Sequence, residues 1–406
     1  MNDAKKLVPK LRFPEFRGAD EWAKQELGRV CEILNNRRRP ITGSDRAPGP
    51  YPYYGASGIV DYVAEFIFDG RLLLVGEDGA KWNAFEKTAF IVEGQYWVNN
   101  HAHVLKPFAI SDTLLENYLT MVDLGPFVTG AAPPKLTLGK LKSIPVPVPP
   151  SAIEQQKVAD CLSSLDELIA AQARKVDALK THKKGLMQQL FPRDGETQPC
   201  RRFPDFQDAG EWEEVALGDI AEIKLGKMLD KQKHTTGHLL PYLNNLSVRW
   251  NDVNTTDLPK MYFNDRELDR FGLRAGDVVV CEGGEPGRAA VWDGRLTDIK
   301  FQKAIHRVRF NVPFEPKIMV LHLENIAGTT AFDKLFTGGG IKHLTGETFS
   351  RLKIPLIPCA EQQRIADCLT SLDDLITAAT QELDTLKTHK KGLMQQLFPS
   401  AETVEA

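Results

Sequence analysis

The sequence LKTHKKGLMQQLFP spans residues 179–192 and occurs again, unchanged at every position, at residues 386–399. The repeat extends beyond this stretch, because the EQQ of residues 154–156 recurs at residues 361–363 with the same offset. Identity over such a length indicates an internal duplication. The rest of the chain is organised around these two copies.

Apolar residues along each copy follow a heptad spacing, with alternating steps of four and three residues. This pattern predicts two long helices that pack along one seam. The helix that leaves the first half ends at the second half, and the other helix returns, so we expect an antiparallel pair. A helix from residue 154 to residue 191 would be roughly 57 Å long at about 1.5 Å per residue. The seam positions are Val158, Leu162, Leu165, Ile169, Gln172, Val176, Leu179, Lys183, Leu186 and Leu190, and then Ile365, Leu369, Leu372, Ile376, Ala379, Leu383, Leu386, Lys390, Leu393 and Leu397.

Lys183 and Lys390 interrupt the seam at the same point of each copy. A buried lysine is costly unless it is paired. One hypothesis is that antiparallel packing places Asp367 opposite Lys183 and Asp160 opposite Lys390. The alternative is that both lysines extend past the edge of the seam into solvent.

Local signals predict how the helices begin and end. Ser151 with Glu154 forms a capping box at the start of the first helix. Gly185 and Gly392 lie inside the helical pattern, so we expect either a closely packed backbone or a frayed helix there. The helix stops are the Phe-Pro pairs at residues 191–192 and 398–399.

Each half of the chain opens with the same segment, RFPEF at residues 12–16 and RFPDF at residues 202–206. Short β-branched runs interrupted by Gly and Pro follow, and then a shorter helix, which predicts an α+β fold in each half. The expected strands are 67–75, 89–92, 277–281 and 289–292, and the shorter helices are 111–122 and 316–325. The predicted architecture is a pseudo-twofold internal repeat of two globular α+β domains separated by two long antiparallel coiled-coil helices. Its predicted parts are 1–150 (first domain with an N-terminal docking segment), 151–192 (first helix), 193–358 (second domain), 359–399 (second helix) and 400–406 (tail).

Composition narrows the class of protein. The 406 residues include six cysteines without a CxxC pair, so we expect reduced thiols, no disulfide and no structural zinc. His101 and His103 are two residues apart but have no further ligand at metal spacing, so we expect no metal and no cofactor. The chain has no long apolar run and no signal peptide at its start, so a soluble, cytoplasmic protein that does not contact a membrane is expected.

Motifs of catalysis are missing from the sequence. It contains no phosphate-binding GxxxxGK[ST] loop, no adenine-methyltransferase [DN]PPY motif and no PD-ExK nuclease pattern. The glycines at 283–287 and 338–340 are better explained as turns. The sequence therefore disfavours a standalone enzyme.

The duplicated architecture and several motifs resemble one known family. The helix starts AIEQQ (152–156) and AEQQ (360–363), the helix ends KKGLMQQLFP, and the runs 94–105 and 338–344 are similar to the DNA specificity subunit of type I restriction-modification enzymes. This resemblance covers essentially the whole chain. It implies a non-catalytic subunit with two target-recognition domains, each reading half of a split site on double-stranded DNA. It also implies helices that set the gap and dock two methyltransferase subunits, and nuclease/translocase subunits that complete the enzyme. The alternative is a coiled-coil scaffold whose domains bind protein.

A DNA-binding chain with a net charge of only -3 must gather its positive charge on one face. Basic and amide side chains can contact phosphates and base edges, and tyrosine hydroxyls can contact phosphates. The alternative for each stretch is a solvated charged loop. The candidates in the first domain are Asn35, Arg37, Arg38, Arg39, Thr42, Tyr53 and Tyr54. Those in the second domain are Lys224, Lys227, Lys231, Lys233, Asn244, Asn245, Lys300, Lys303, Lys342 and His343.

Overall fold

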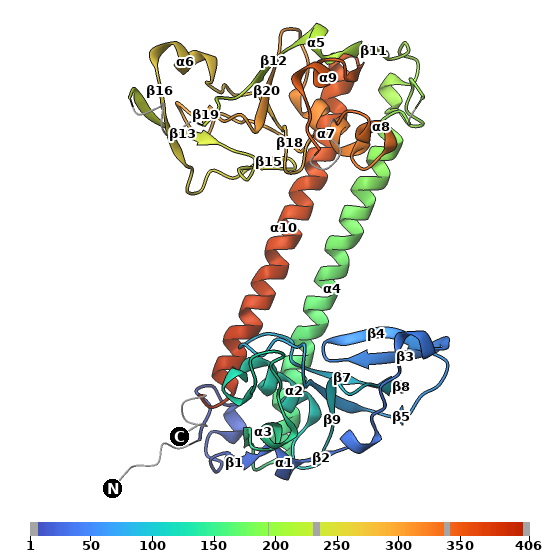
Figure 1. Ribbon diagram of the computed structural model, residues 1–406, viewed down its shortest axis with the longest axis vertical. Coiled ribbons are helices and arrows are strands. Elements are labelled where there is room, and N and C mark those ends of the chain that lie inside the picture. The colour runs from blue at the N-terminus through green and yellow to red at the C-terminus, as the bar shows by residue number, and fades with distance from the viewer. Residues whose placement is uncertain (1–6, 194, 230–235, 337–341, 401–406) are drawn as a thin grey trace. The chain divides into compact units, whose positions relative to one another are not determined.

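The computed structural model describes residues 7–193, 195–229, 236–336 and 342–400. Its chain forms two compact units, shown with their helices and strands in Figure 1. Unit 1 comprises Met1–Lys175 and Ala379–Ala406, and unit 2 comprises Val176–Ala378. Each unit therefore contains one α+β region and a part of both long helices.

Unit 1 is built on a four-stranded sheet of order β2-β9-β6-β7 beside a second sheet of order β4-β3-β8-β5, and β1 pairs with β10. The central strand β6 is buried along its whole length, and α2 packs on this sheet. The strands are β1 (Ala23–Glu26), β2 (Cys31–Ile33), β3 (Pro48–Gly55), β4 (Gly58–Val63), β5 (Phe68–Asp69), β6 (Leu72–Gly76), β7 (Ala89–Val92), β8 (Gln95–Val98), β9 (Ala102–Pro107) and β10 (Pro145–Val148). The helices are α1 (Leu27–Val30), α2 (Asp112–Met121) and α3 (Leu138–Lys142), with 3-10 turns at Pro14–Phe16, Asn35–Arg37, Gly43–Asp45 and Gly125–Phe127.

Unit 2 repeats this plan with sheets of order β12-β20-β17-β18 and β16-β13-β19, and with β11 paired to β21. The strands are β11 (Glu213–Ala216), β12 (Ala221–Leu225), β13 (His238–Leu243), β14 (Val248–Arg249), β15 (Asp252–Val253), β16 (Lys260–Phe263), β17 (Val278–Cys281), β18 (Ala289–Val291), β19 (Lys300–Phe301), β20 (Ile305–Phe310) and β21 (Lys353–Leu356). The helices are α5 (Leu217–Ile220), α6 (Asp265–Arg270), α7 (Pro316–Ile326), α8 (Thr330–Asp333) and α9 (Gly346–Ser350), with a 3-10 turn at Pro204–Phe206.

The two units share an uncommon pairing that confirms the internal repeat. β3 runs parallel to β8 in unit 1, and β13 runs parallel to β19 in unit 2, whereas the other strand pairs around them are antiparallel. The predicted α+β class is confirmed. The helices expected at 111–122 and 316–325 are α2 and α7, within a residue at each end. The single strand expected at 67–75 is wrong, because Gly70 has φ +112 and divides it into β5 and β6.

The two long helices are α4 (Ala152–Leu190) and α10 (Cys359–Leu397), and both are continuous. Every predicted seam position is buried or half-buried, whereas Leu168 and Leu375, which lie off the seam, are each 54% exposed. The contacts inside unit 1 are antiparallel, because Asp166 meets Lys390 and Gln172 meets the backbone of Ala379. At their ends the seams also join the cores of the α+β regions. Val158 and Leu162 pack with α2, and Ile365 and Leu369 pack with α7.

Two expectations about the helix ends are wrong. The Glu154 N–H donates a long hydrogen bond of 3.5 Å to the Ser151 hydroxyl, but the Glu154 carboxylate binds Arg12 instead, so the reciprocal half of the capping box is not made. At Gly185 and Gly392 an added Cβ would meet open space, and the helix continues past both glycines. The prediction that both helices end just before the Phe-Pro pairs is confirmed.

Lys183 and Lys390 do pair with acids, but the predicted partners are wrong. Lys183 lies 2.7 Å from Asp373 and 3.1 Å from Glu324 of α7, and Lys390 lies 2.6 Å from Asp166. The true partners are six residues beyond Asp367 and Asp160, because the register of the antiparallel helices differs from the predicted one. In unit 2 the buried lysine therefore ties both helices to α7.

We expect Lys183→Met to lower the free energy of unfolding by about 1–2 kcal/mol. Removal of the ammonium group leaves Glu324 and Asp373 facing each other, but both acids remain about one-quarter exposed, so the loss stays below that of a fully buried pair. Urea unfolding measures the change, with the exposed Lys180→Met on the same helix as control. An unchanged or increased stability would support the alternative, in which Lys183 only extends past the edge of the seam.

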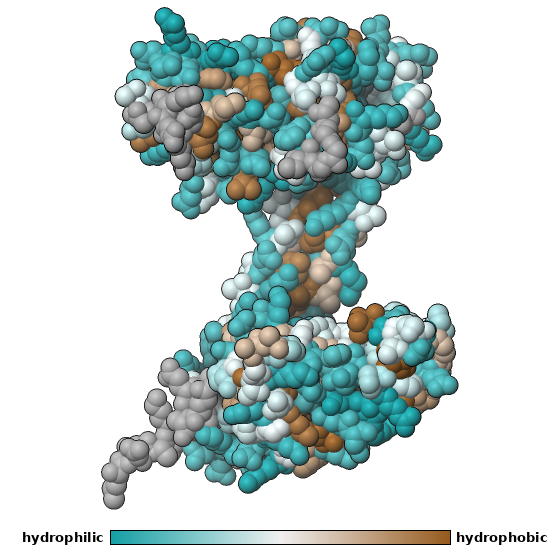
Figure 2. Space-filling view, viewed as in Figure 1, coloured by the Kyte–Doolittle hydropathy of each residue, from teal (hydrophilic) through white to brown (hydrophobic). Residues whose placement is uncertain are grey.

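The remaining sequence expectations concern thiols and membranes. All six cysteines lie within the described residues and are free, as predicted. In the described part of the chain, no helix is long and apolar enough to cross a bilayer. Figure 2 shows a mainly hydrophilic surface with scattered apolar patches on the face in view.

Candidate nucleic-acid interface

The basic loop of unit 1 divides into residues that hold it and residues that face solvent. Arg38 donates to Glu77 at 2.7 Å and to the Ala102 carbonyl at 2.8 Å, so its guanidinium is half-buried. The Asn35 side chain contacts His103 Nδ1 at 2.8 Å and accepts from the Val104 N–H. Both candidates therefore serve the fold of the loop.

Arg37 and Arg39 are exposed at the surface of the same loop. Arg37 donates to the Ile67 carbonyl at 3.0 Å with its guanidinium 4.7 Å from the ring centre of Phe68. The backbone of Arg39 is held in place, because its carbonyl accepts a hydrogen bond from Trp97 Nε1 at 2.6 Å. Within the described residues the Arg39 guanidinium has no ion-pair partner. Arg39 is thus a charged side chain on a rigid backbone.

The polar candidates that follow the loop differ in exposure. Thr42 is exposed and donates to Asp45 at 2.5 Å. Tyr53 is only 1% exposed, and its hydroxyl accepts from the Ile41 N–H at 3.0 Å. Tyr54 is half-buried against Tyr96, and burial raises the pKa of its hydroxyl. Of the two tyrosines, Tyr53 belongs to the core beneath the loop.

Two lysine candidates of unit 2 are buried. Lys227 donates to Glu267 at 2.6 Å and to the Tyr262 carbonyl at 2.8 Å. Lys300 occupies the place in β19 that Trp97 has in β8, and burial lowers its pKa. Lys224 is half-buried and donates to Glu222 at 3.0 Å. Lys231 and Lys233 lie outside the described residues.

The other candidates of unit 2 lie on turns or exposed segments. Asn244 caps its own turn by accepting from the Ser247 N–H at 3.1 Å, and the carbonyl of Asn245 accepts from Arg288 at 2.6 Å. Lys303, Lys342 and His343 are exposed, and Lys342 also contacts Asp333 at 2.6 Å.

Three segments distant in sequence meet at one point of unit 1, which we call the strand-end junction. It comprises residues 77–79 after β6, residues 99–101 between β8 and β9, and residues 135–136. The Glu77 N–H donates to the His101 carbonyl at 2.8 Å, and the Leu136 N–H donates to the Glu77 carbonyl at 2.8 Å. His103 Nε2 lies 2.7 Å from the Leu136 carbonyl, and burial lowers the pKa of its ring.

Unit 2 has the same junction, at residues 282–284, 302–304 and 343–344. The Glu282 N–H donates to the Ala304 carbonyl at 2.8 Å, the Leu344 N–H donates to the Glu282 carbonyl at 2.9 Å, and His306 Nε2 lies 2.7 Å from the Leu344 carbonyl. Gly284 has φ +82, and a Cβ there would lie 2.7 Å from the Asn245 amide. The backbone scaffold is thus shared, while the exposed side chains on it differ between the units.

The junction of unit 1 carries a charged cluster that the sequence analysis missed. Asp78 is 8% exposed and binds His101 through one carboxylate oxygen and Lys135, at 2.8 Å, through the other. Burial raises the pKa of Asp78, but the hydrogen bonds from Lys135 and His101 outweigh burial and lower it overall. The three residues come from three segments without any common spacing, so no sequence signal connected them.

Each helix start holds its α+β region through two polar side chains. Glu154 accepts from Arg12 Nε at 2.7 Å and from Trp22 Nε1 at 3.2 Å, all in the interior of unit 1. Gln155 then accepts from the Ser111 N–H at 2.9 Å, at the start of α2. Unit 2 repeats both contacts with Glu361, Arg202 and Trp212, and with Gln362 and the N–H of Glu315. The first two residues of the EQQ motif thereby attach each α+β region to its helix.

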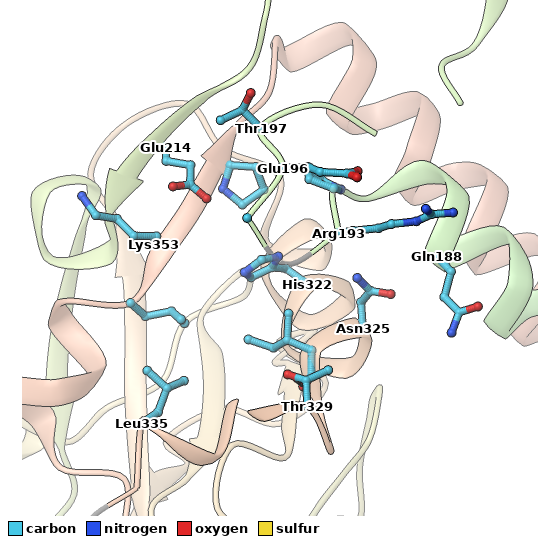
Figure 3. Close-up of a pocket in the computed structure, with 15 residues that line it drawn as sticks. Gln188, Arg193, Glu196, Thr197, Glu214, His322, Asn325, Thr329, Leu335 and Lys353 are labelled. Atoms are coloured by element: carbon cyan, nitrogen blue, oxygen red, sulfur yellow. Dashed lines mark hydrogen bonds between the residues drawn. The ribbon is translucent and has the colours of Figure 1, made fainter. Parts of the chain in front are cut away.

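A pocket of about 550 Å³ in unit 2 lies between the end of α4, α7 and β21 (Figure 3). Burial lowers the pKa of His322 at its wall to about 4, and no hydrogen-bond partner for Nδ1 is found in the described residues. His322 faces the Phe191 ring at 6.2 Å, much as Tyr118 faces Phe398 at 5.6 Å in unit 1. The pocket is lined by side chains of both charges, among them Arg193, Glu196, Glu214 and Lys353. No group of His, Cys, Asp and Glu in the described ranges could hold a metal ion.

Comparison with known proteins identifies the family. The type I restriction modification DNA specificity domain matches residues 19–181 and 209–388, once in each half. This chain belongs to the DNA specificity subunits of type I restriction-modification systems. The specificity subunit is the non-catalytic member of such a system, and the catalytic activities lie in its partner subunits.

Individual relatives extend over nearly the whole specificity subunit. A putative type I restriction enzyme specificity subunit of Haemophilus influenzae is 26% identical over 373 residues, covering 89% of this chain and 90% of the relative. The MjaVIII specificity subunit of Methanocaldococcus jannaschii is 21% identical over 415 residues, covering 96% and 93%. The fold is similar to the crystal structure of the S subunit from M. genitalium, with a TM-score of 0.61, 14% identity and coverage of 97% and 100%. The family assembles into a type I complex that binds DNA.

Proposed function

We propose that unit 1 and unit 2 each read one half of an asymmetric, bipartite site on double-stranded DNA. The observation that carries this proposal is the strand-end junction, where one backbone scaffold occurs in both units while the exposed side chains around it differ. An identical scaffold with different side chains suits two readers of different sequences. Arg39 is exposed next to the junction of unit 1, and Lys303 is exposed within the junction of unit 2.

We infer that α4 and α10 set the distance between the two half-sites. Each helix is continuous over 39 residues and contributes to both units. The Glu154–Arg12 and Glu361–Arg202 contacts attach each α+β region to a helix start. The spacer between half-sites then follows from helix length.

The helices also support a proposal about partners. In the duplicated stretch the buried positions are explained by packing, but six exposed positions are identical as well: Lys180/Lys387, Thr181/Thr388, His182/His389, Lys184/Lys391, Gln188/Gln395 and Gln189/Gln396. Two identical exposed surfaces suit two copies of one partner. We assign this partner to the methyltransferase subunits, with nuclease/translocase subunits joining the resulting complex.

The test is DNA binding by the full chain together with its methyltransferase partner. Methylation mapping of the source genome supplies the site. We expect affinity for a duplex with this site to fall by about tenfold or more between 50 and 200 mM salt. Scrambling either half-site, or lengthening the spacer, serves as the control and should weaken binding. Absent or salt-insensitive binding would instead favour the coiled-coil scaffold whose domains bind protein.

A further inference from the structure

The Asp78 cluster at the strand-end junction of unit 1 has the chemistry of an anion contact. Asp78 is buried, yet both groups that it binds reach solvent, with the side chains of His101 and Lys135 50% and 42% exposed. The two pairings satisfy the buried carboxylate and leave both partner side chains accessible to a ligand. Here it holds two surface side chains in fixed positions, which lowers the entropy that they lose when they bind a ligand.

Hydrogen bonds to the backbone hold the segments that carry His101 and Lys135. Asn99 Oδ1 accepts from the His101 N–H at 2.8 Å, and Thr129 and Lys135 exchange backbone hydrogen bonds at 2.8 Å. Neighbouring Arg38 is paired with Glu77 and its side chain is only 13% exposed, so it is less accessible to a ligand. The exposed basic side chains are therefore Lys135 and His101 in the junction and Arg39 next to it.

Unit 2 also carries basic side chains at its junction, although Gly283 stands in place of Asp78 and Ala304 in place of His101. His343 stands where Lys135 stands, since Leu344 and Leu136 make the same hydrogen bond to the strand end. Lys303 lies in the turn that corresponds to residues 99–101, and both side chains are exposed. Two sequences with little similarity thus place basic side chains on the same backbone.

We propose that Lys135 and His101, held by Asp78, form a phosphate-binding clamp that anchors the DNA backbone of the first half-site. This inference rests on the proposed function and names the residues that would position the duplex. Lys135 and His101 contact the phosphate, and Asp78 is a positioning residue. Phosphate contacts fix register and orientation without reading sequence.

The test measures the salt dependence of DNA binding by the complete complex, with Lys135→Ala, Lys135→Arg and Asp78→Asn as variants. Lys135→Ala should weaken binding about tenfold and lower the slope of log affinity against log salt by about one counterion. Lys135→Arg should retain the slope. Asp78→Asn should weaken binding with the slope unchanged, because the Lys135 ammonium remains but is no longer held by the carboxylate.

The matched control is Lys106→Ala, which removes an exposed lysine from the other end of β9 and should change neither quantity. Thermal melting verifies that each variant is folded. An unchanged slope and affinity for Lys135→Ala would overturn the clamp, and so would a changed methylation sequence, which would indicate base reading. Failure of the wild-type chain to bind its mapped site would refute the proposed function itself, which distinguishes the two failures.

Discussion

Replacing Glu154 with alanine should lower the free energy of unfolding by about 3–5 kcal/mol. The carboxylate accepts three hydrogen bonds, two from Arg12 and one from Trp22, and the Arg12 and Glu154 side chains are only 5% and 1% exposed. Without Glu154 the guanidinium remains buried with only the carbonyls of Ala19 and Asp20 as partners. A mutation that leaves a buried charge without a partner is among the most destabilising changes in a protein.

Urea unfolding with hydrogen exchange locates this loss, which we expect in the amides of unit 1. Glu361→Ala should produce the same effect in unit 2, and the exposed Glu167→Ala on the same helix provides the control. The double variant Arg12→Met with Glu154→Met should recover much of the stability, since it removes both charges. A loss below about 1 kcal/mol for Glu154→Ala would contradict a structural role for the pair.

Local periodicity made the long helices predictable from sequence. The heptad pattern identified each seam position, because spacing along one helix fixes which side chains share a face. It did not identify the partners of Lys183, since Asp373 and Glu324 reach it only after α7 packs on the helices. Contacts that need three elements at once have no signature in one stretch of sequence.

The candidate site was less predictable than the fold, for a related reason. Counting basic residues selected Lys227 and Lys300, but each lies in the interior once the strands pair. Arg38 and its neighbour Arg39 looked alike in the sequence, yet only Arg38 turns inward to Glu77. Asp78 escaped notice because an isolated acid in a loop carries no signal until Lys135 and His101 are brought to it.

Exchanging residues 35–145 for the corresponding residues of another specificity subunit should replace one half-site completely. The exchanged segment contains the basic loop, both larger sheets of unit 1 apart from β2, and the strand-end junction. It leaves in place Arg12, Trp22 and Glu154, which attach the region to α4. Gln155 binds the backbone N–H of Ser111 rather than its side chain. The α2 helix of another specificity subunit can therefore make the same contact.

Methylation mapping of a genome that carries the exchanged gene gives the outcome directly. We expect a new sequence in the first half-site, with the second half-site and the spacer unchanged, because unit 2 and both helices are untouched. The reciprocal exchange of residues 225–353 in unit 2 is the matched control and should alter only the other half. Simultaneous change of both halves would mean that the units read DNA jointly. A changed spacer with both sequences retained would mean that the α+β regions, rather than α4 and α10, set the distance.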